Sequence, residues 1–468
     1  MQPSWLGRFV VVGTLWVALV GCLVAWLPGC RGAGDGVLHV ASGGRPNVLL
    51  ITIDTLRADH LGAYGYGLAT SPVIDRLARE GVTFDNAYTP VPTTAPAVAS
   101  LLTGRYVDAT HVRENEAELP VSSYTLGEAL AAAGFVTAGF YGNGALAKGF
   151  GQGLGVWQPF DAKWAADDAA GGTLAVRWLE SAQAPWFLWV HFMDPHGPYT
   201  SPPERSASFV YPDTPLLRRE LPLSPTNWGF GVIPRYQALP GLTHVGDYVR
   251  RYDGEIVGTD IQVGRLLDAL EKSGMLDDTL VVLTADHGES LGEDDYFFQH
   301  GKVLNEASLR VPLLMRHPAL PRGTRVAAPV SLVDLLPTVT AMLGVPLTET
   351  VAGIDVRGAI AGKDLPARDL LAYTVTRPET VAIRRDGFKL VGLPRRDGTQ
   401  RPGFAGLALY AVGDGHEKRV AGGGQAKLIE SLEPEMLDLV KRVSRAGASP
   451  VDLNAEQRER LRALGYVD

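Results

Sequence analysis

The stretch Thr279-Leu-Val-Val-Leu-Thr-Ala-Asp-His-Gly-Glu289 indicates how this chain folds. It begins with aliphatic and β-branched residues without polar alternation, which is typical of a strand buried on both faces of a parallel sheet. This strand runs into Asp286 and His287, and a second strand of the same kind, Asn47–Ile53, is followed by Asp54. Ligands of open α/β sheets bind beyond the carboxyl ends of the strands. Two strands that both end in a carboxylate therefore predict a shared cation.

From Asn47 onward the chain alternates short apolar runs with segments of helical spacing, which predicts a doubly wound, mostly parallel α/β domain. The expected elements are, in chain order, helices 72–80 and 125–133, strands 135–140 and 186–192, helix 260–273 and strand 310–315. The Pro-rich stretch from Pro202 to Tyr248 lacks a clear period, and we expect it to form a long loop over the site.

Beyond about Val345 the pattern changes. A hairpin that turns at Asp386-Gly387 predicts a small antiparallel sheet, followed by helices near 427–444 and 455–464. We therefore expect a leader at 1–30, a linker at 31–44, a catalytic domain at 45–345 and a C-terminal subdomain with a small sheet and terminal helices at 346–468.

The composition is that of a globular protein: 468 residues, 46% hydrophobic and 20% charged, with a net charge of -8. The sequence has no run of basic residues, so we expect no nucleic-acid partner. The two cysteines, Cys22 and Cys30, both lie in the leader. This position excludes a disulfide and a thiol nucleophile in the folded body.

The N-terminal segment Phe9–Leu27 is apolar and uncharged, as in a membrane-spanning helix or a secretory signal. Leu19-Val-Gly-Cys22 and Leu27-Pro-Gly-Cys30 each resemble the lipobox of bacterial lipoproteins, in which a cysteine becomes lipidated. We favour a lipoprotein over an uncleaved anchor helix and over plain secretion. All three place the catalytic part outside the cytoplasm, and the first two attach it to the membrane through the N-terminus.

Four segments resemble, in order, the signatures of the sulfatase family within the alkaline phosphatase superfamily: Arg45–Gly62, Thr94–Arg105, Thr284–Glu289 and His300–Pro312. The resemblance covers about residues 45–345, and the closing segment Arg460–Val467 resembles the tails of bacterial members. It implies an alkaline phosphatase-like fold and a metal-dependent hydrolase of phosphate or sulfate esters.

Matched residue by residue, the resemblance implies that Thr94 is the nucleophile, at the start of a helix. It implies that the metal ligands are Asp54, Asp286 and His287, together with Thr94 itself. Such ligands suit one or two divalent ions, zinc or manganese in preference to calcium, and the cation would lower the pKa of a bound hydroxyl and screen the anionic ester. The helix-start amides would face the ester oxygens.

Further residues match positions that hold a second metal or the transferred group: Asp194, His196, His300 and Lys302. We expect His300 and Lys302 to act as proton donor and clamp, or His300 to join Asp194 and His196 around a second ion. Asn115 is a candidate donor to the leaving oxyanion.

The chain also departs from the pattern of sulfatases proper. They carry Cys or Ser at the position of Thr94 and oxidise it to formylglycine, a route closed to threonine. Val98 stands where they have Arg, Thr55 where they have a second Asp, and Gly142-Asn143-Gly144 where they have Lys-Trp-His. The retained set resembles the phosphodiesterase and phospholipid head-group transferase branches, which use zinc or manganese. We therefore favour phosphoryl transfer.

Other interpretations of these residues stay open. Thr94 is consistent with a helix cap, with Thr93 as the competing nucleophile. Asp194-Pro-His196 is consistent with a turn, Lys302 with a solvated surface charge and Asn115 with a structural role. We interpret three further histidines as structural: His60, His111 and His191.

Two other functions fit the same sequence. One is an arylsulfatase that works without formylglycine. The other is a catalytically inactive surface binding protein, which we disfavour because binding alone does not require two strands that end in aligned carboxylates.

Overall fold

The computed structural model describes residues 44–160, 168–375, 379–395, 404–413, 415–420 and 426–445, together with Arg458 and Leu461. The leader, the expected helix at 455–464 and the closing segment Arg460–Val467 lie outside these described residues, apart from Arg458 and Leu461 themselves. Across the ranges described, no helix has both the length and the hydropathy to cross a membrane.

An eight-stranded sheet forms the centre of the fold, in the order β12-β2-β11-β7-β1-β6-β4-β5. In the same order the strands are Thr324–Val326, Val82–Phe84, Leu313–Arg316, Thr279–Ala285, Asn47–Ile53, Trp186–Phe192, Val136–Tyr141 and Val156–Pro159. Among the described strands of this sheet, only β11 runs antiparallel to its neighbours. The expected mostly parallel α/β fold is confirmed.

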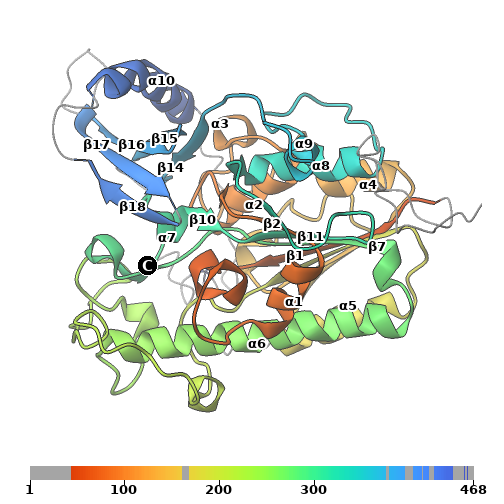
Figure 1. The fold of residues 1–468 in the computed structure, drawn as a ribbon, viewed down its shortest axis with the longest axis horizontal. Helices are drawn as coiled ribbons and strands as arrows, with labels where there is room; N and C mark the ends of the chain where they lie inside the picture. The colour runs from red at the N-terminus through yellow and green to blue at the C-terminus, as the bar shows by residue number, and fades with distance from the viewer. Residues whose placement is uncertain are drawn as a thin grey trace, which may run out of the picture. The chain divides into compact units, whose positions relative to one another are not determined.

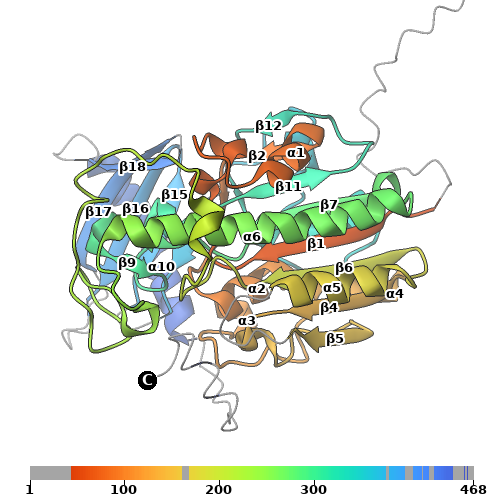
Figure 2. The ribbon, with the colours of Figure 1, turned by 90° about the horizontal axis from the view of Figure 1, so that it is seen from below.

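Helices cover both faces of this sheet (Figure 1). On one face lie α1 (Pro72–Glu80), α5 (Asp168–Leu179) and α6 (Val245–Lys272), and Figure 2 shows α5 and α6 in front of the central strands. On the other face lie α2 (Thr94–Thr103), α4 (Leu126–Ala132) and α8 (Leu335–Met342). Strands β1, β6 and β7 are therefore buried along their whole length, which explains their unbroken apolar sequences.

Strand β1 lies between β6 and β7, and this register fixes the position of the site. Its last residue, Ile53, pairs with Ala285 of β7 and with Phe192 of β6. Asp54, Asp286 and the segment after Phe192 therefore leave the sheet at the same edge.

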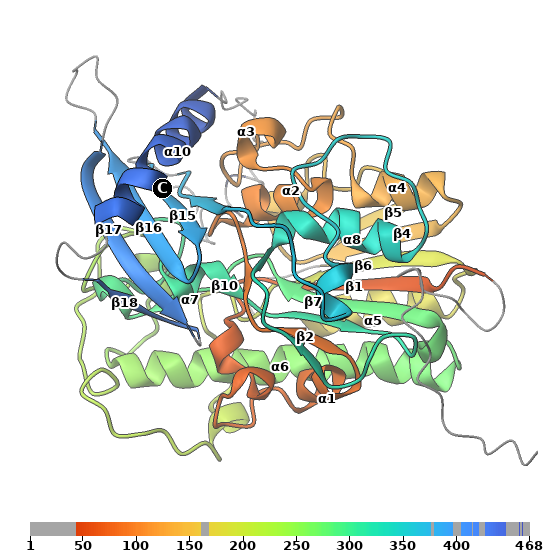
Figure 3. The same ribbon diagram turned by 45° about the horizontal axis from the view of Figure 1, so that its top comes forward.

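A second, antiparallel sheet of five strands follows in the C-terminal part: β14 (Leu370–Tyr373), β15 (Val381–Arg385), β16 (Phe388–Pro394), β17 (Phe404–Gly413) and β18 (His416–Arg419). The predicted hairpin is confirmed, since β15 and β16 join at Asp386 and Gly387, both with positive φ. Helix α10 (Ala426–Arg445) packs on this sheet through Leu432 and Met436 (Figure 3).

Smaller elements complete the fold. A three-stranded sheet joins β10 (Arg310–Val311), β3 (Ala87–Tyr88) and β13 (Val330–Ser331), and β8 (Ser290–Leu291) pairs with β9 (Phe297–Gln299). The short helices are α3 (Val107–Thr110), α7 (Glu306–Leu309) and α9 (Arg357–Ile360). The strand expected at 310–315 is therefore divided between two sheets at Pro312, which has no N–H to donate to a ladder.

One element was predicted wrongly. Helix α6 starts at Val245, not near Asp260, so the end of the expected loop, including Tyr248, is helical. Glycines obscure the helical pattern here, and side chains of another segment pack closely against two of them. A Cβ on Gly254 would lie 2.5 Å from Ser201 Oγ, and one on Gly258 would lie 2.3 Å from Arg205 Nη1.

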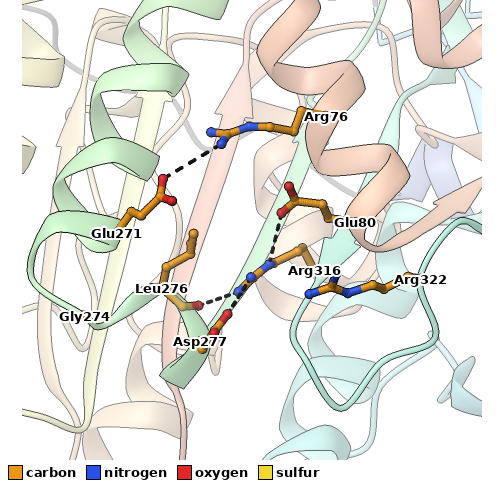
Figure 4. Close-up of a pocket in the computed structure, with 8 residues that line it drawn as sticks. All are labelled: Arg76, Glu80, Glu271, Gly274, Leu276, Asp277, Arg316 and Arg322. Carbon is orange, nitrogen blue, oxygen red and sulfur yellow. Dashed lines mark hydrogen bonds and ion pairs between the residues drawn. The ribbon is translucent and has the colours of Figure 1, made fainter. Parts of the chain in front are cut away.

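The opposite edge of the sheet carries a groove of about 270 Å³ (Figure 4). Arg316 pairs in register with Val281, near the start of β7, and forms ion pairs with Asp277 at 2.6 Å and Glu80 at 3.7 Å. These ion pairs connect α1 and β11 to the turn before β7. The groove is lined by three acidic and three basic side chains.

Candidate active site

Two buried carboxylates mark the carboxyl edge of the sheet. Asp286 Oδ1 accepts hydrogen bonds from the backbone N–H groups of His287 at 2.7 Å and Thr55 at 3.2 Å. Asp286 Oδ2 and Asp54 Oδ1 are buried and have no hydrogen-bond partner among the described residues. Burial, followed by the charge of Asp54, raises the pKa of Asp286 to about 7. Although burial acts in the opposite direction, the histidines around Asp54, with His196 first, hold the pKa of that carboxyl well below its usual range.

His287 lies against both carboxylates. Its Nε2 is 3.5 Å from Asp286 Oδ2 and 4.0 Å from Asp54 Oδ1. Its Nδ1 is 2.9 Å from the carbonyl oxygen of Gly288, so Nδ1 carries the proton and Nε2 presents its lone pair to the carboxylates. Burial lowers the pKa of His287, which keeps the ring neutral.

The structure adds His191 to this group, although we interpreted it as structural from the sequence. Its Nε2 lies 3.4 Å from Asp54 Oδ2, and its Nδ1 lies 2.8 Å from Thr52 Oγ. His191, Asp54 and Asp286 offer ligand atoms that all lie within 4.8 Å of one another.

Thr94 is the first residue of α2 and is fully buried. Its Oγ lies 3.4 Å from His287 Nε2, so the predicted nucleophile and the predicted ligands share one site. Asn143 Nδ2 lies 3.5 Å from the same Oγ and donates to Asp54 Oδ2 at 2.6 Å. Asn115 Oδ1 accepts the N–H of Ala95 at 2.8 Å and so holds the first turn of α2 in place.

A second group of histidines adjoins the first. The ring centroid of His300 lies 4.5 Å from that of His287 and 5.1 Å from that of His196. His196 Nδ1 lies 2.7 Å from the carbonyl oxygen of Gly197. Burial lowers the pKa of His196, and it lowers that of His300 to about 4.

Asp194 and Lys302, two of the predicted site residues, have contacts beyond the two histidine groups. The carboxyl of Asp194 interacts with Glu255 and Asp168, and burial together with these acids raises its pKa well above the usual range. Lys302 places its ammonium 4.4 Å from the ring centroid of Trp228, which comes from the long loop.

The predicted long loop does adjoin the site. Tyr236 places its ring 6.5 Å from that of His196, and its hydroxyl donates to the carbonyl oxygen of Phe298 at 2.9 Å. The side chain of Gln237 donates to the same oxygen at 3.1 Å. The loop therefore holds the segment that leads to His300.

The donor set fits a divalent cation. Burial of two carboxylates with partnerless oxygens is costly unless a cation or donor completes them. Carboxylate oxygens beside an imidazole Nε2 are ligands that zinc and manganese accept. Asp54, Asp286 and His191 would bring the ligand atoms for such a cation together, and His287 Nε2 lies 3.5 Å from Asp286 Oδ2.

Sequence reasoning missed three residues of the site: His191, Asn143 and Glu289. His191 is hidden in a strand buried on both faces, where alternation gives no signal. Asn143 follows β4 (Val136–Tyr141) as Asp54 follows β1, and this shared position at a strand exit could have identified it. Glu289 closes the Asp286 motif, but its partners come from other segments.

Comparisons of the sequence and of the structure with known proteins agree with each other. The family model described as Sulfatase matches residues 46–345. An ulvan-active sulfatase of Formosa agariphila is 27% identical over 365 residues, which cover 71% of this chain and 68% of that protein.

Solved structures share the fold. A protein solved with its substrate D-glucosamine-2-N,6-O-disulfate aligns with a TM-score of 0.69 at 20% identity, over 86% of this chain and 98% of that one. A phosphonate monoester hydrolase of Agrobacterium radiobacter aligns with a TM-score of 0.67 at 23% identity, over 85% of this chain and 96% of that one.

Proposed function

Because this chain belongs to the sulfatase family, as the match over residues 46–345 shows, we propose that it is an extracytoplasmic, metal-dependent ester hydrolase with Thr94 as its nucleophile. The favoured substrates are phosphodiesters or phosphonate monoesters. The observation that carries the proposal is the 3.4 Å distance between Thr94 Oγ and His287 Nε2, beside two buried carboxylates with partnerless oxygens.

Asp54, Asp286 and His287 would hold one divalent cation, zinc or manganese in preference to calcium, which would lower the pKa of a bound hydroxyl and screen the ester's charge. Thr94 Oγ attacks phosphorus in line with the ester oxygen. As that ester bond breaks, phosphorus becomes bonded to Thr94 and keeps its other substituent, so the intermediate is a threonine phosphodiester or a threonine phosphonate ester. Asn143 Nδ2 donates toward Thr94 Oγ and stabilises that oxygen as it loses its proton. Water or an acceptor alcohol then releases the phosphoryl group.

In this proposal Nε2 of the neutral His300 ring takes the proton that Thr94 loses and passes it to the leaving oxygen, and Lys302 binds an outer oxygen of the ester. The alternative, a second cation at Asp194, His196 and His300, is less favourable because the carboxyl of Asp194 interacts with Glu255 and Asp168.

Three substitutions favour phosphorus over sulfur. Threonine cannot yield formylglycine. Val98 is fully buried within α2, so its position offers no cation for a sulfate oxygen. Thr55, which stands at the position of a second acidic ligand, offers only a hydroxyl.

Sulfate-ester hydrolysis is the second candidate. It is supported by the relatives that bear sulfatase names, including the ulvan-active enzyme. The same site would then transfer a sulfuryl group to Thr94 without formylglycine.

The experiment compares Thr94→Ala and Thr94→Ser with the wild type on three substrates: 4-nitrophenyl phenylphosphonate, a 4-nitrophenyl phosphodiester and 4-nitrophenyl sulfate. Each substrate is assayed with Zn²⁺, Mn²⁺ or Ca²⁺. We expect Thr94→Ala to lose at least about 10³-fold in kcat, since nucleophile removal in hydrolases has this size or more. Thr94→Ser keeps a hydroxyl and should retain part of the activity. Undiminished turnover by Thr94→Ala would remove this residue from the chemistry, and preference for the sulfate ester would favour the second candidate.

The location is proposed from the leader alone, Phe9–Leu27 with Cys22 and Cys30. Metabolic labelling with a radioactive fatty acid in a bacterial host tests it. We expect label in the membrane fraction that is lost in Cys22→Ser or in Cys30→Ser, and unlabelled protein in that fraction would indicate the uncleaved anchor.

A further inference from the structure

Glu289 is a fully buried glutamate that the reaction outlined above does not use. Its Oε1 lies 3.1 Å from His300 Nδ1, and its Oε2 accepts a hydrogen bond from the hydroxyl of Tyr199 at 3.0 Å. Tyr199 is itself fully buried, so both carboxylate oxygens are held by groups that solvent does not reach.

The backbone around His300 is fixed as well. Its carbonyl oxygen accepts a hydrogen bond from Tyr296 at 2.7 Å. Phe298 has a φ of 55° and Gly301 a φ of 90°, in the left-handed region. A phenylalanine with a positive φ is strained, and it keeps this conformation only where the packing around it holds the backbone in place. Backbone strain of this kind concentrates at functional sites.

The contact with Glu289 fixes the orientation of the His300 ring through Nδ1. Nδ1 and Nε2 lie on opposite sides of an imidazole ring, so a ring held through Nδ1 directs Nε2 away from the carboxylate. The same ring lies 4.5 Å from the ring of His287, whose Nε2 is 3.4 Å from Thr94 Oγ. A carboxylate behind a histidine fixes its tautomer and its orientation.

We propose that Glu289 is a positioning residue for His300, and that it holds the imidazole so that Nε2 meets the leaving oxygen of the ester. This inference rests on the proposed function, in which His300 assists the leaving group. Tyr199 acts one step further out, through the second oxygen of Glu289.

The test is a double-mutant cycle of Glu289→Gln, His300→Ala and the combined variant, assayed with phenyl and 4-nitrophenyl esters of one phosphonate. Glu289→Gln keeps the size of the side chain and removes its charge. In the wild-type background we expect it to lower kcat for the phenyl ester by about 10–100-fold, the usual range for the partner of a functional histidine, with KM within about twofold. The loss should be smaller for the 4-nitrophenyl ester, whose better leaving group needs less assistance.

The decisive comparison is made in the His300→Ala background. There, Glu289→Gln should change kcat by less than about twofold, because the ring through which Glu289 acts is absent. Equal losses in both backgrounds, equal losses with both esters, or no loss at all would each overturn the proposal.

Two further variants serve as a control and as a substitute for Glu289→Gln. Glu293→Gln removes a charge from the same segment, where Glu293 pairs with Arg57 at 2.8 Å, and it should leave the ratio between the two esters unchanged. Should Glu289→Gln not fold, Tyr199→Phe removes only the hydroxyl that holds Glu289 and should shift the ester ratio in the same direction. Failure of the proposed function is separate, since it appears as undiminished turnover by Thr94→Ala.

Discussion

Replacement of Asn143 by alanine tests the architecture of the site directly. Asn143 Nδ2 donates to Asp54 Oδ2 at 2.6 Å, and both residues are fully buried. A hydrogen bond to a charged group contributes roughly 1.5–3 kcal/mol, and loss of the donor leaves a buried carboxylate less well solvated. At about 1.4 kcal/mol for each factor of ten, we expect kcat/KM to fall by about 10–100-fold.

The assay is steady-state hydrolysis of a 4-nitrophenyl phosphonate, with the melting temperature as the check on folding. Asn143→Asp serves as the matched variant, because it keeps the oxygen that accepts the N–H of Ala145 at 2.9 Å but cannot donate. It also sets a second carboxylate against Asp54, so its loss should equal or exceed that of Asn143→Ala. A loss below about threefold in either folded variant would refute the view that this donor supports Asp54 and Thr94.

Three further predictions concern metal, helix start and pH. Asp286→Asn should purify with less metal than the wild type by elemental analysis and should lose the rise in melting temperature on addition of Zn²⁺; equal metal content would contradict the ligand assignment. Asn115→Ala removes the acceptor for the N–H of Ala95 and should lower the free energy of unfolding by about 1 kcal/mol in urea titrations, whereas no change would show that water replaces it. Burial raises the pKa of Asp260 to about 6, so the folded state binds its proton more tightly than the unfolded state and the stability contribution falls as pH rises from about 4 to about 6. Asp260→Asn should therefore gain up to about 3 kcal/mol relative to the wild type between pH 4 and pH 7 in urea titrations, and a pH-independent difference would contradict this sign.

Much of the candidate site was predictable because Asp54, Asp286 and His287 lie where buried strands end. The apolar runs before Asp54 and Asp286 identify two buried strands, and parallel strands place their exits at one edge. The same reasoning cannot predict His191. Its strand is buried on both faces, so polar and apolar residues do not alternate along it, and the sequence does not show which way the histidine points. Its role depends on its register with Thr52, which pairs with it across β1 and β6.

The parts that escaped prediction depend on contacts between distant segments. Glu289 closes the Asp286 motif, yet its partner Tyr199 lies 90 residues away in the chain. Helix α6 (Val245–Lys272) was recognised only in its second half, because Gly254 and Gly258 break the apolar pattern where the segment with Ser201 and Arg205 packs closely. The helix propensity of the local sequence does not depend on which distant segment packs against it.

The buried oxygens of Asp54 and Asp286 also argue against an inactive binding protein. A buried polar group without a partner costs roughly 1–3 kcal/mol, and more when it is charged, whereas a whole domain is stable by only about 5–15 kcal/mol. Two such oxygens beside the Nε2 of His287 would lower the free energy of unfolding in a protein that bound no cation at this site. A cation removes this cost and at the same time places positive charge next to Thr94 Oγ. In the proposed function, the cation that stabilises the fold would therefore also prepare the hydroxyl for attack.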